Sequence, residues 1–178
     1  MKIIPKGLKL VAFPLLVGGG IAALVSFPPA IATPALNFKS VIVVRTFFDK
    51  IRITTQHQGE DDVQGADPFR AKIDVDDADI YVVDTTVPPG GNSGWHTHPG
   101  PSIVAVKSGT ATVYDGDDPT CTPVTYPAGT GFVDAGGGHV HMVRNAGNVQ
   151  LELIAFQTIP AGASRRIDAP DPGFCPNL

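Results

Sequence analysis

The stretch from Gly90 to Asn145 reads GGNSGWHTHPGPSIVAVKSGTATVYDGDDPTCTPVTYPAGTGFVDAGGGHVHMVRN and contains four of the five histidines of the chain. These histidines form two His-x-His pairs, His96-Thr97-His98 and His139-Val140-His141. Side chains two residues apart on a β-strand point to the same face of the sheet. If both pairs lie on strands that meet inside one domain, they form a nitrogen-rich pocket. Imidazole is a common ligand of zinc, iron, copper and nickel, so the pattern predicts a transition-metal site.

The segments around the histidines are short, apolar or alternating, and are separated by turn sequences rich in Gly, Pro and Asn. No long amphipathic helix appears, and this pattern predicts an all-β fold, an antiparallel sandwich or barrel. The apolar run Ser40–Phe48 fits a strand or the start of a helix. Tight hairpin turns are expected at Ser108-Gly109 and at 145–148. The other segments expected to form strands are Ile51–Thr55, Phe69–Val75, Asp79–Val87, Gly94–His98, Ile103–Lys107, Thr110–Asp115, Cys121–Tyr126, Gly131–Asp134, His139–Arg144 and Val149–Thr158.

The N-terminus has the layout of a secretory signal peptide. Three lysines within the first nine residues precede the uncharged apolar run Leu10–Val25, and Ala30-Ile31-Ala32 is a small-x-small cleavage pattern. Residues 1–32 are therefore expected to be a signal peptide, and the mature protein to be secreted. A retained membrane anchor is the alternative, although the run of about 16 residues is shorter than the roughly 20 that a spanning helix needs.

The composition indicates one acidic domain after signal cleavage. The chain has 178 residues, which fits a single domain. Removing residues 1–32 leaves ten basic and seventeen acidic side chains, a net charge of −7. This charge argues against nucleic acid and anionic membrane as partners, and no stable membrane insertion is expected after cleavage.

The two cysteines, Cys121 and Cys175, both lie in the part of the chain expected to be exported. In an oxidising compartment they most simply form one disulfide, which would tie the C-terminal tail to the domain. The closed loop of about 54 residues would contribute roughly 4 kcal/mol by chain entropy. Two free thiols are the alternative.

The histidine stretch resembles the cupin superfamily of small jelly-roll β-barrels. The first cupin motif places a glycine six positions before a His-x-His pair, as Gly90 precedes His96, and closes on a glycine at the position of Gly109. The second motif is matched by Pro127-Ala128-Gly129 and by His141 followed four residues later by Asn145. The resemblance covers about 56 residues with the order and spacing of the family.

The resemblance implies a metal site held by His96, His98 and His141. A typical metal-binding cupin adds a glutamate from the first motif, but that position is Ser102 in this chain. His139 is the obvious substitute, pointing into the barrel or lying at its rim. Asp134 is expected either to accept a hydrogen bond from a ligand imidazole or to cap a turn. A barrel in which the histidines are packed without metal remains the alternative.

The expected organisation is a signal peptide at 1–32, an N-terminal linker with edge strands at 33–68, the cupin barrel at 69–160 and a disulfide-tethered tail at 161–178. The resemblance implies an exported metal-dependent enzyme, dioxygenase- or isomerase-like, that acts on a small molecule with zinc, iron, copper or nickel. A non-catalytic cupin that binds a small ligand or metal is the alternative, and a homodimer is a further expectation.

Overall fold

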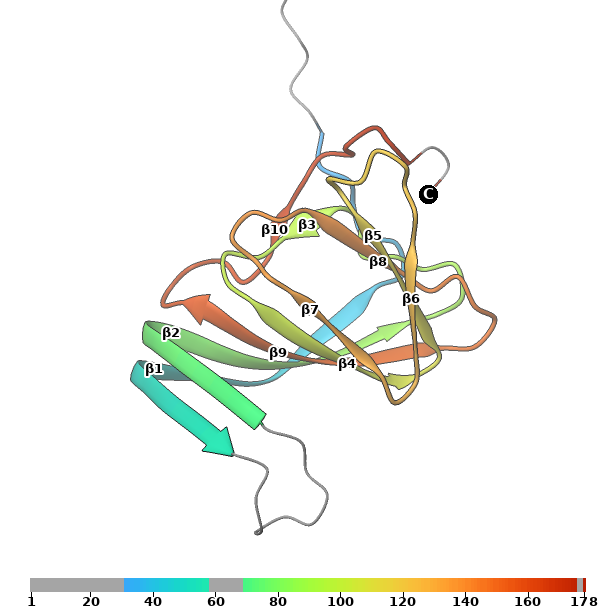
Figure 1. The fold of residues 1–178 in the computed structure, drawn as a ribbon. Helices are drawn as coiled ribbons and strands as arrows, with labels where there is room; N and C mark the ends of the chain where they lie inside the picture. The colour runs from blue at the N-terminus through green and yellow to red at the C-terminus, as the bar shows by residue number, and fades with distance from the viewer. Residues whose placement is uncertain (1–30, 58–68, 176–177) are drawn as a thin grey trace, which may run out of the picture.

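The computed structural model of the protein describes residues 31–57, 69–175 and 178. In this part of the chain the strands form two antiparallel five-stranded sheets that enclose a common interior (Figure 1). The expected all-β jelly-roll architecture is thereby confirmed. The described residues include no helix that is long and apolar enough to cross a membrane. Most of the segment expected to be a signal peptide, residues 1–30, lies outside the described residues.

Each of the two sheets contains strands from both the N-terminal and the C-terminal parts of the domain or from its middle, so neither is a single continuous segment of the chain. The first sheet has the order β1-β2-β9-β4-β7 and contains β1 (Lys39–His57), β2 (Phe69–Val87), β9 (Leu151–Pro160), β4 (Ser102–Ser108) and β7 (Gly131–Asp134). The second sheet has the order β10-β3-β8-β5-β6 and contains β10 (Ile167–Asp168), β3 (His96–Thr97), β8 (His141–Arg144), β5 (Thr110–Asp115) and β6 (Val124–Pro127). Apolar side chains from both sheets form the main core, which comprises Val87, Val104, Val106, Ala111, Val143, Leu151 and Leu153.

The first two strands form one long antiparallel hairpin that extends beyond the rest of the sheet (Figure 1). The prediction of two separate strands at Phe69–Val75 and Asp79–Val87 is wrong, because β2 runs from one to the other without a break. Its pairing with β1 continues on both sides, with Lys50 opposite Asp76 and Phe48 opposite Ala78. Asp77 itself takes a positive φ of 45°, so the local irregularity is absorbed within the strand.

Two turns expected to close hairpins instead carry the chain from one sheet to the other. Ser108-Gly109 connects β4 to β5, and residues 145–148 connect β8 to β9, yet neither pair of strands shares a sheet. A local turn pattern shows that the chain reverses, but it does not show whether the next strand pairs with the last one. The strand expected to be the last, Val149–Thr158, is β9 and is followed by the short β10.

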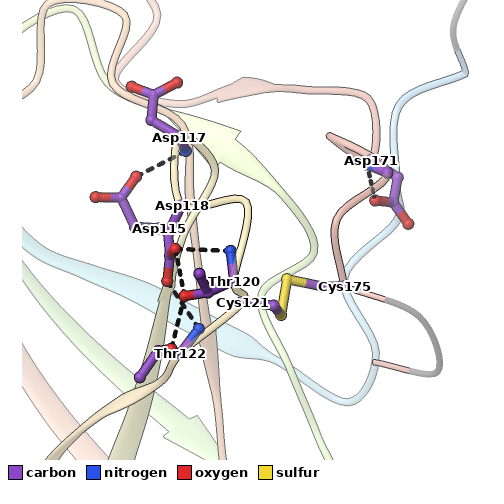
Figure 2. The surroundings of a disulfide bond; sticks show 9 residues. Asp115, Asp117, Asp118, Thr120, Cys121, Thr122, Asp171 and Cys175 are labelled. Atoms are coloured by element: carbon purple, nitrogen blue, oxygen red, sulfur yellow. Dashed lines mark hydrogen bonds between the residues drawn. A yellow bond between two sulfur atoms is a disulfide. The ribbon is translucent and has the colours of Figure 1, made fainter.

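The predicted disulfide between Cys121 and Cys175 is present and joins the loop after β5 to the C-terminal tail (Figure 2). The carboxylates near the disulfide form hydrogen bonds within the turn after β5. Asp115 accepts the backbone N–H of Asp117. Asp118 accepts the backbone N–H groups of Thr120 and Thr122 in the same way (Figure 2).

Candidate metal centre

Three buried histidines meet between the two sheets. His96 lies on β3 directly opposite His141 at the start of β8, and His98 follows the end of β3. The ring centroids are 4.3 Å apart for His96–His141, 5.0 Å for His96–His98 and 5.5 Å for His98–His141. One ring nitrogen from each residue lies within 4.8 Å of the others. The structure therefore brings together three of the four histidines predicted to bind metal, and their nitrogens converge closely enough to share one ion.

Backbone carbonyls set the tautomers of two of these rings. Nδ1 of His96 lies 3.0 Å from the carbonyl oxygen of Gly94, and Nδ1 of His98 is hydrogen-bonded to the carbonyl oxygen of Arg165. A carbonyl oxygen can only accept, so each Nδ1 carries the proton and each Nε2 keeps a free lone pair. Histidines that bind metals in proteins are commonly oriented by this kind of bond to the second nitrogen.

The environment also keeps the three imidazoles uncharged. Burial lowers the pKa of His96 far below its ordinary value, and the nearby His141 and Arg166 lower it further. Burial likewise lowers the pKa of His98, and it lowers that of His141 to about 4. All three rings are therefore neutral at pH 7, which is the protonation state that a metal ligand requires.

A buried carboxylate stands beside this cluster. Asp134, the last residue of β7, is paired across the sheet with Ser102 on β4, and its side chain is only 3% exposed. Its Oδ1 accepts the backbone N–H of Gly136 at 3.1 Å and lies 3.6 Å from Nδ1 of His141. Its Oδ2 lies 4.0 Å from Nε2 of His98 and has no hydrogen-bond partner among the described residues. Asp134 thus caps the turn, one of the two roles expected for it, and it also presents a free carboxylate oxygen to the imidazoles.

The free oxygen of Asp134 provides a test of whether these residues suit a metal ion. A buried polar atom in a folded protein nearly always has a partner, and an isolated buried anion is costly. Nδ1 of His141 is likewise buried without a partner. Three neutral imidazoles and one unpartnered carboxylate oxygen form a nitrogen-rich donor set of the kind that binds divalent transition metals. The donor set therefore fits such an ion.

His139 occupies a different place from the other three histidines. The prediction that it shares a strand with His141 is wrong, because β8 begins at His141. The preceding glycines, Gly136, Gly137 and Gly138, all have positive φ and bend the chain before the strand begins.

His139 lies at the rim of the cavity, with its side chain 34% exposed. Its Nδ1 lies 3.3 Å from Oδ1 of Asp134, and its Nε2 lies 3.1 Å from Oδ1 of Asp115. Burial alone would lower the pKa of His139, but the hydrogen bonds to Asp115 and Asp134 raise it above its ordinary value. Both ring nitrogens are therefore directed at carboxylates.

Two polar residues of the site were not predicted from the sequence, Gln157 on β9 and Arg165 in the loop after it. Gln157 is 2% exposed and donates from Nε2 to Oγ of Ser102 at 3.0 Å. Its Oε1 accepts a hydrogen bond from Nη1 of Arg165 at 3.1 Å. The sequence did contain one signal for Gln157, because it continues the inward-facing, otherwise apolar positions of β9, Leu151, Leu153 and Ala155.

The histidines line a cavity of about 300 Å³ to which both sheets contribute. Its charged and ionisable lining consists of the three histidines, Asp134, Arg165 and Arg166, and Gln157 lies among them. The remainder of the wall is largely apolar and includes Phe38, Val83, Val104, Phe132, Val143, Leu153 and Ala155. This volume is at the lower end of the range for ligand pockets, so the cavity suits a small molecule.

The family model described as the cupin domain matches residues 83–157. None of the curated proteins compared with the chain matches it.

Solved structures with a similar fold include a cupin-like protein from Thermotoga maritima, with a TM-score of 0.45 and 21% identity over 52% of this chain and 65% of that one. A protein with a double-stranded β-helix domain from Klebsiella pneumoniae has a TM-score of 0.42 and 20% identity over 68% of this chain and 84% of that one. A cupin superfamily protein from Desulfitobacterium hafniense has a TM-score of 0.40 and 10% identity over 45% of this chain and 67% of that one.

Proposed function

We propose, from the membership of the chain in the cupin superfamily through its domain at residues 83–157, that it is a metal-binding protein. In this proposal His96, His98 and His141 bind one divalent transition-metal ion that acts on a small molecule. The observation that carries the proposal is the convergence of three buried imidazoles, two of which have Nδ1 bound to a backbone carbonyl. Zinc, iron, copper and nickel all suit such ligands.

Asp134 supplies the negative charge in this proposal. The family places a carboxylate at the position of Ser102, and Asp134 lies directly opposite Ser102 on the neighbouring strand. Its Oδ2 is buried and free, at 4.0 Å from Nε2 of His98. A carboxylate from β7 thus offsets part of the charge of a divalent ion, although the usual glutamate is absent from β4.

The proposed activity is that of a metal-dependent enzyme, dioxygenase- or isomerase-like, on a small substrate. With few protein ligands, a bound metal keeps coordination positions for water or substrate and supplies Lewis acidity there. The chain itself provides the walls of the cavity, to which both sheets contribute apolar side chains. Gln157 holds Ser102 and Arg165 in place beside His98.

Export of the mature protein is part of the proposal. The signal-like segment at residues 1–32 supports it, and so does the Cys121–Cys175 disulfide, since disulfides persist mainly in oxidising compartments. Mass spectrometry of the protein recovered from its host tests this point. A mature N-terminus after Ala32 is expected, and a full-length protein retained in the membrane fraction would contradict it.

Metal content tests the proposed centre. Protein purified from metal-replete medium is expected to contain about one transition-metal ion per chain by elemental analysis. His98→Ala removes a ligand from the centre and should lower this occupancy sharply. His57→Ala is the matched control, because position 57 is paired with Phe69 at the far end of the β1–β2 hairpin. Wild-type protein without metal, or equal losses in the two variants, would refute the assignment.

A screen for turnover separates the enzyme from a module that only binds. Metal-loaded protein is incubated with a panel of small organic molecules while oxygen consumption and product formation are followed. Turnover that is lost in His98→Ala supports the enzyme. Stoichiometric ligand binding without any product across the panel would instead establish a non-catalytic cupin.

A further inference from the structure

Two cationic side chains that the proposed metal site does not use line the cavity, Arg165 and Arg166. Arg165 lies in the loop between β9 and β10 and lines the cavity together with the three histidines. Its Nη1 donates to Oε1 of Gln157, while Nε2 of Gln157 lies 3.4 Å from Nδ1 of His98. The guanidinium group is therefore one glutamine side chain away from a proposed metal ligand.

The charge of Arg165 has no counter-ion among the described residues. No carboxylate in this part of the chain lies within ion-pair distance of its guanidinium group, whereas the neighbouring Arg166 is paired with Asp168 at 2.7 Å. Arg166 also donates to the carbonyl oxygen of Ser93. Burial and the proximity of Arg166 lower the pKa of Arg165, as expected for a partly buried cation without a partner. A guanidinium group has five N–H donors, and the bond to Gln157 uses one of them.

The loop that carries Arg165 is held in position by the body of the protein. The backbone N–H of Gly162 donates to Oδ2 of the buried Asp79, and the N–H of Ala161 donates to the carbonyl of Asp77. The carbonyl of Arg165 itself is hydrogen-bonded to Nδ1 of His98. Because these bonds fix the backbone of the loop, Arg165 is held at the cavity that it lines.

We propose that this cavity binds a small organic carboxylate, with its carboxylate on the guanidinium group of Arg165 and its apolar part against the walls formed by Val104, Phe132 and Leu153. The proposal names the substrate class of the proposed metal centre and rests on that function for the placement of the ligand beside the metal. Arg166 is paired with Asp168, so a divalent ion and Arg165 face the single carboxylate of Asp134 and leave the cavity positive, and an anion completes it.

The geometry favours a carboxylate over an inorganic anion. The planar fork of a guanidinium group matches the two oxygens of a carboxylate in a paired arrangement. The cavity is also lined by apolar side chains, which an organic group would cover and a phosphate ion would not. The volume of about 300 Å³ limits the ligand to a small molecule.

Titration calorimetry with three probes tests the proposal. Benzoate is the carboxylate, benzamide is its uncharged analogue of the same shape, and inorganic phosphate is the anion without an apolar group. Wild-type protein should bind benzoate, and should bind benzamide and phosphate at least about tenfold more weakly. Binding of benzamide or phosphate as tight as that of benzoate would overturn the proposal.

Substitutions of Arg165 locate the binding. Arg165→Gln should weaken benzoate binding by about 10- to 100-fold, and Arg165→Lys should recover only part of the loss, because lysine keeps the charge without the planar fork. Arg70→Gln on the exposed outer part of β2 is the matched control and should bind benzoate as the wild type does. The carbonyl bond to His98 comes from the backbone, so both Arg165 variants keep it. Equal benzoate affinity in Arg165→Gln and wild type would overturn the proposal.

The same measurements on metal-loaded and chelator-treated protein separate this inference from the proposed metal function. If the protein holds no metal but Arg165→Gln still loses benzoate binding, the metal centre is refuted and the carboxylate site stands. If the protein binds metal normally while the affinity for benzoate is the same in wild type and Arg165→Gln, the carboxylate site is refuted and the metal centre stands.

Discussion

Asp134 stands at the point where this chain departs from the usual cupin ligand set. The position at which the family has its metal-binding glutamate is Ser102 in this chain. The hydroxyl oxygen of Ser102 accepts a hydrogen bond from Nε2 of Gln157. Asp134 reaches the same region from β7, because the two positions are directly opposite each other in the β4–β7 ladder. Side chains at paired positions of neighbouring strands project to the same face of a sheet, so one can take over a role that the other has lost.

Removal of this charge should weaken metal binding. Asp134→Asn keeps the shape of the side chain but removes the anion, and we expect the metal affinity to fall by about 10- to 100-fold, the range seen for carboxylates that support metal sites. Isothermal titration with Zn²⁺ measures the effect. Asp49→Asn, at an exposed position of β1, is the control and should leave the affinity unchanged.

A second substitution tests whether the position of the charge matters. Ser102→Glu in the Asp134→Asn background returns a carboxylate to the family position and should recover at least part of the lost affinity. The thermal stability of each variant is measured alongside, so that unfolding is not mistaken for ligand loss. Zn²⁺ affinity that is insensitive to Asp134→Asn would refute the role of this residue.

At the scale of secondary structure elements, the turn before β8 determines where His141 lies. Gly136 has a φ of +68°, and a Cβ at this position would lie 2.3 Å from the backbone of Gly100, in the loop that follows His98. The turns that carry the two histidine pairs therefore pack backbone against backbone. This close approach explains why glycine stands at this position of the triple-glycine segment.

Gly136→Ala and Gly137→Ala should have different effects on stability. Gly137 has nearly the same φ, +66°, but a Cβ there would meet nothing within 4 Å. Gly137→Ala should therefore cost only the strain of a left-handed backbone, about 1–3 kcal/mol. Gly136→Ala adds the clash with Gly100 and should destabilise the protein more, as measured by urea unfolding. Equal losses of stability would contradict the packing argument.

The long β1–β2 hairpin is joined to the loop after β9 by one buried carboxylate. Asp79 accepts Nε and Nη2 of Arg45 at 3.1 and 2.7 Å and also the backbone N–H of Gly162 at 2.9 Å. The hydrogen bond from Arg45 lowers the pKa of Asp79, and that from Gly162 lowers it further. A single side chain thus links β1 and β2 to the loop that carries Arg165.

The lowered pKa of Asp79 predicts how stability depends on pH. A carboxyl group with a pKa lower in the folded than in the unfolded state stabilises the fold above its unfolded pKa of about 3.9. This stabilisation is lost as the pH falls through the lower, folded pKa. Asp79→Asn should therefore have a lower melting temperature than wild type at pH 7, and the difference should shrink below about pH 4. A difference that stays constant down to pH 2 would contradict this account.

At the scale of the whole molecule, the disulfide ties the C-terminal tail to the loop after β5. The bond closes a sequence separation of 54 residues. The double variant Cys121→Ser/Cys175→Ser should lose about 4 kcal/mol of unfolding free energy, because the unfolded chain regains the entropy of the open loop. Urea unfolding of the oxidised protein measures this difference. Reduced wild-type protein is the control and should resemble the variant, whereas an unchanged midpoint in the variant would contradict the prediction.

The sequence alone was enough to predict the all-β jelly-roll fold, the disulfide and three converging histidines. These features depend on signals that are local or pairwise: alternation along strands, two His-x-His pairs at cupin spacing, and only two cysteines. Strand alternation predicts that both histidines of the first pair lie on one face, and the resemblance to cupins implies that His141 joins them.

Only the tertiary structure decided which charges surround those histidines. Asp134 lies opposite Ser102, and Gln157 reaches Ser102 from 55 residues away in the sequence. Arg165 bonds through its carbonyl to His98 across a similar separation. Strand order and register are set by packing between sheets, and local sequence does not encode which distant strands become neighbours. The sequence therefore predicted the three histidines and named Asp134 as a candidate beside them, whereas the pairing of Asp134 with Ser102 and the presence of Arg165 beside His98 emerged only from the assembled sheets.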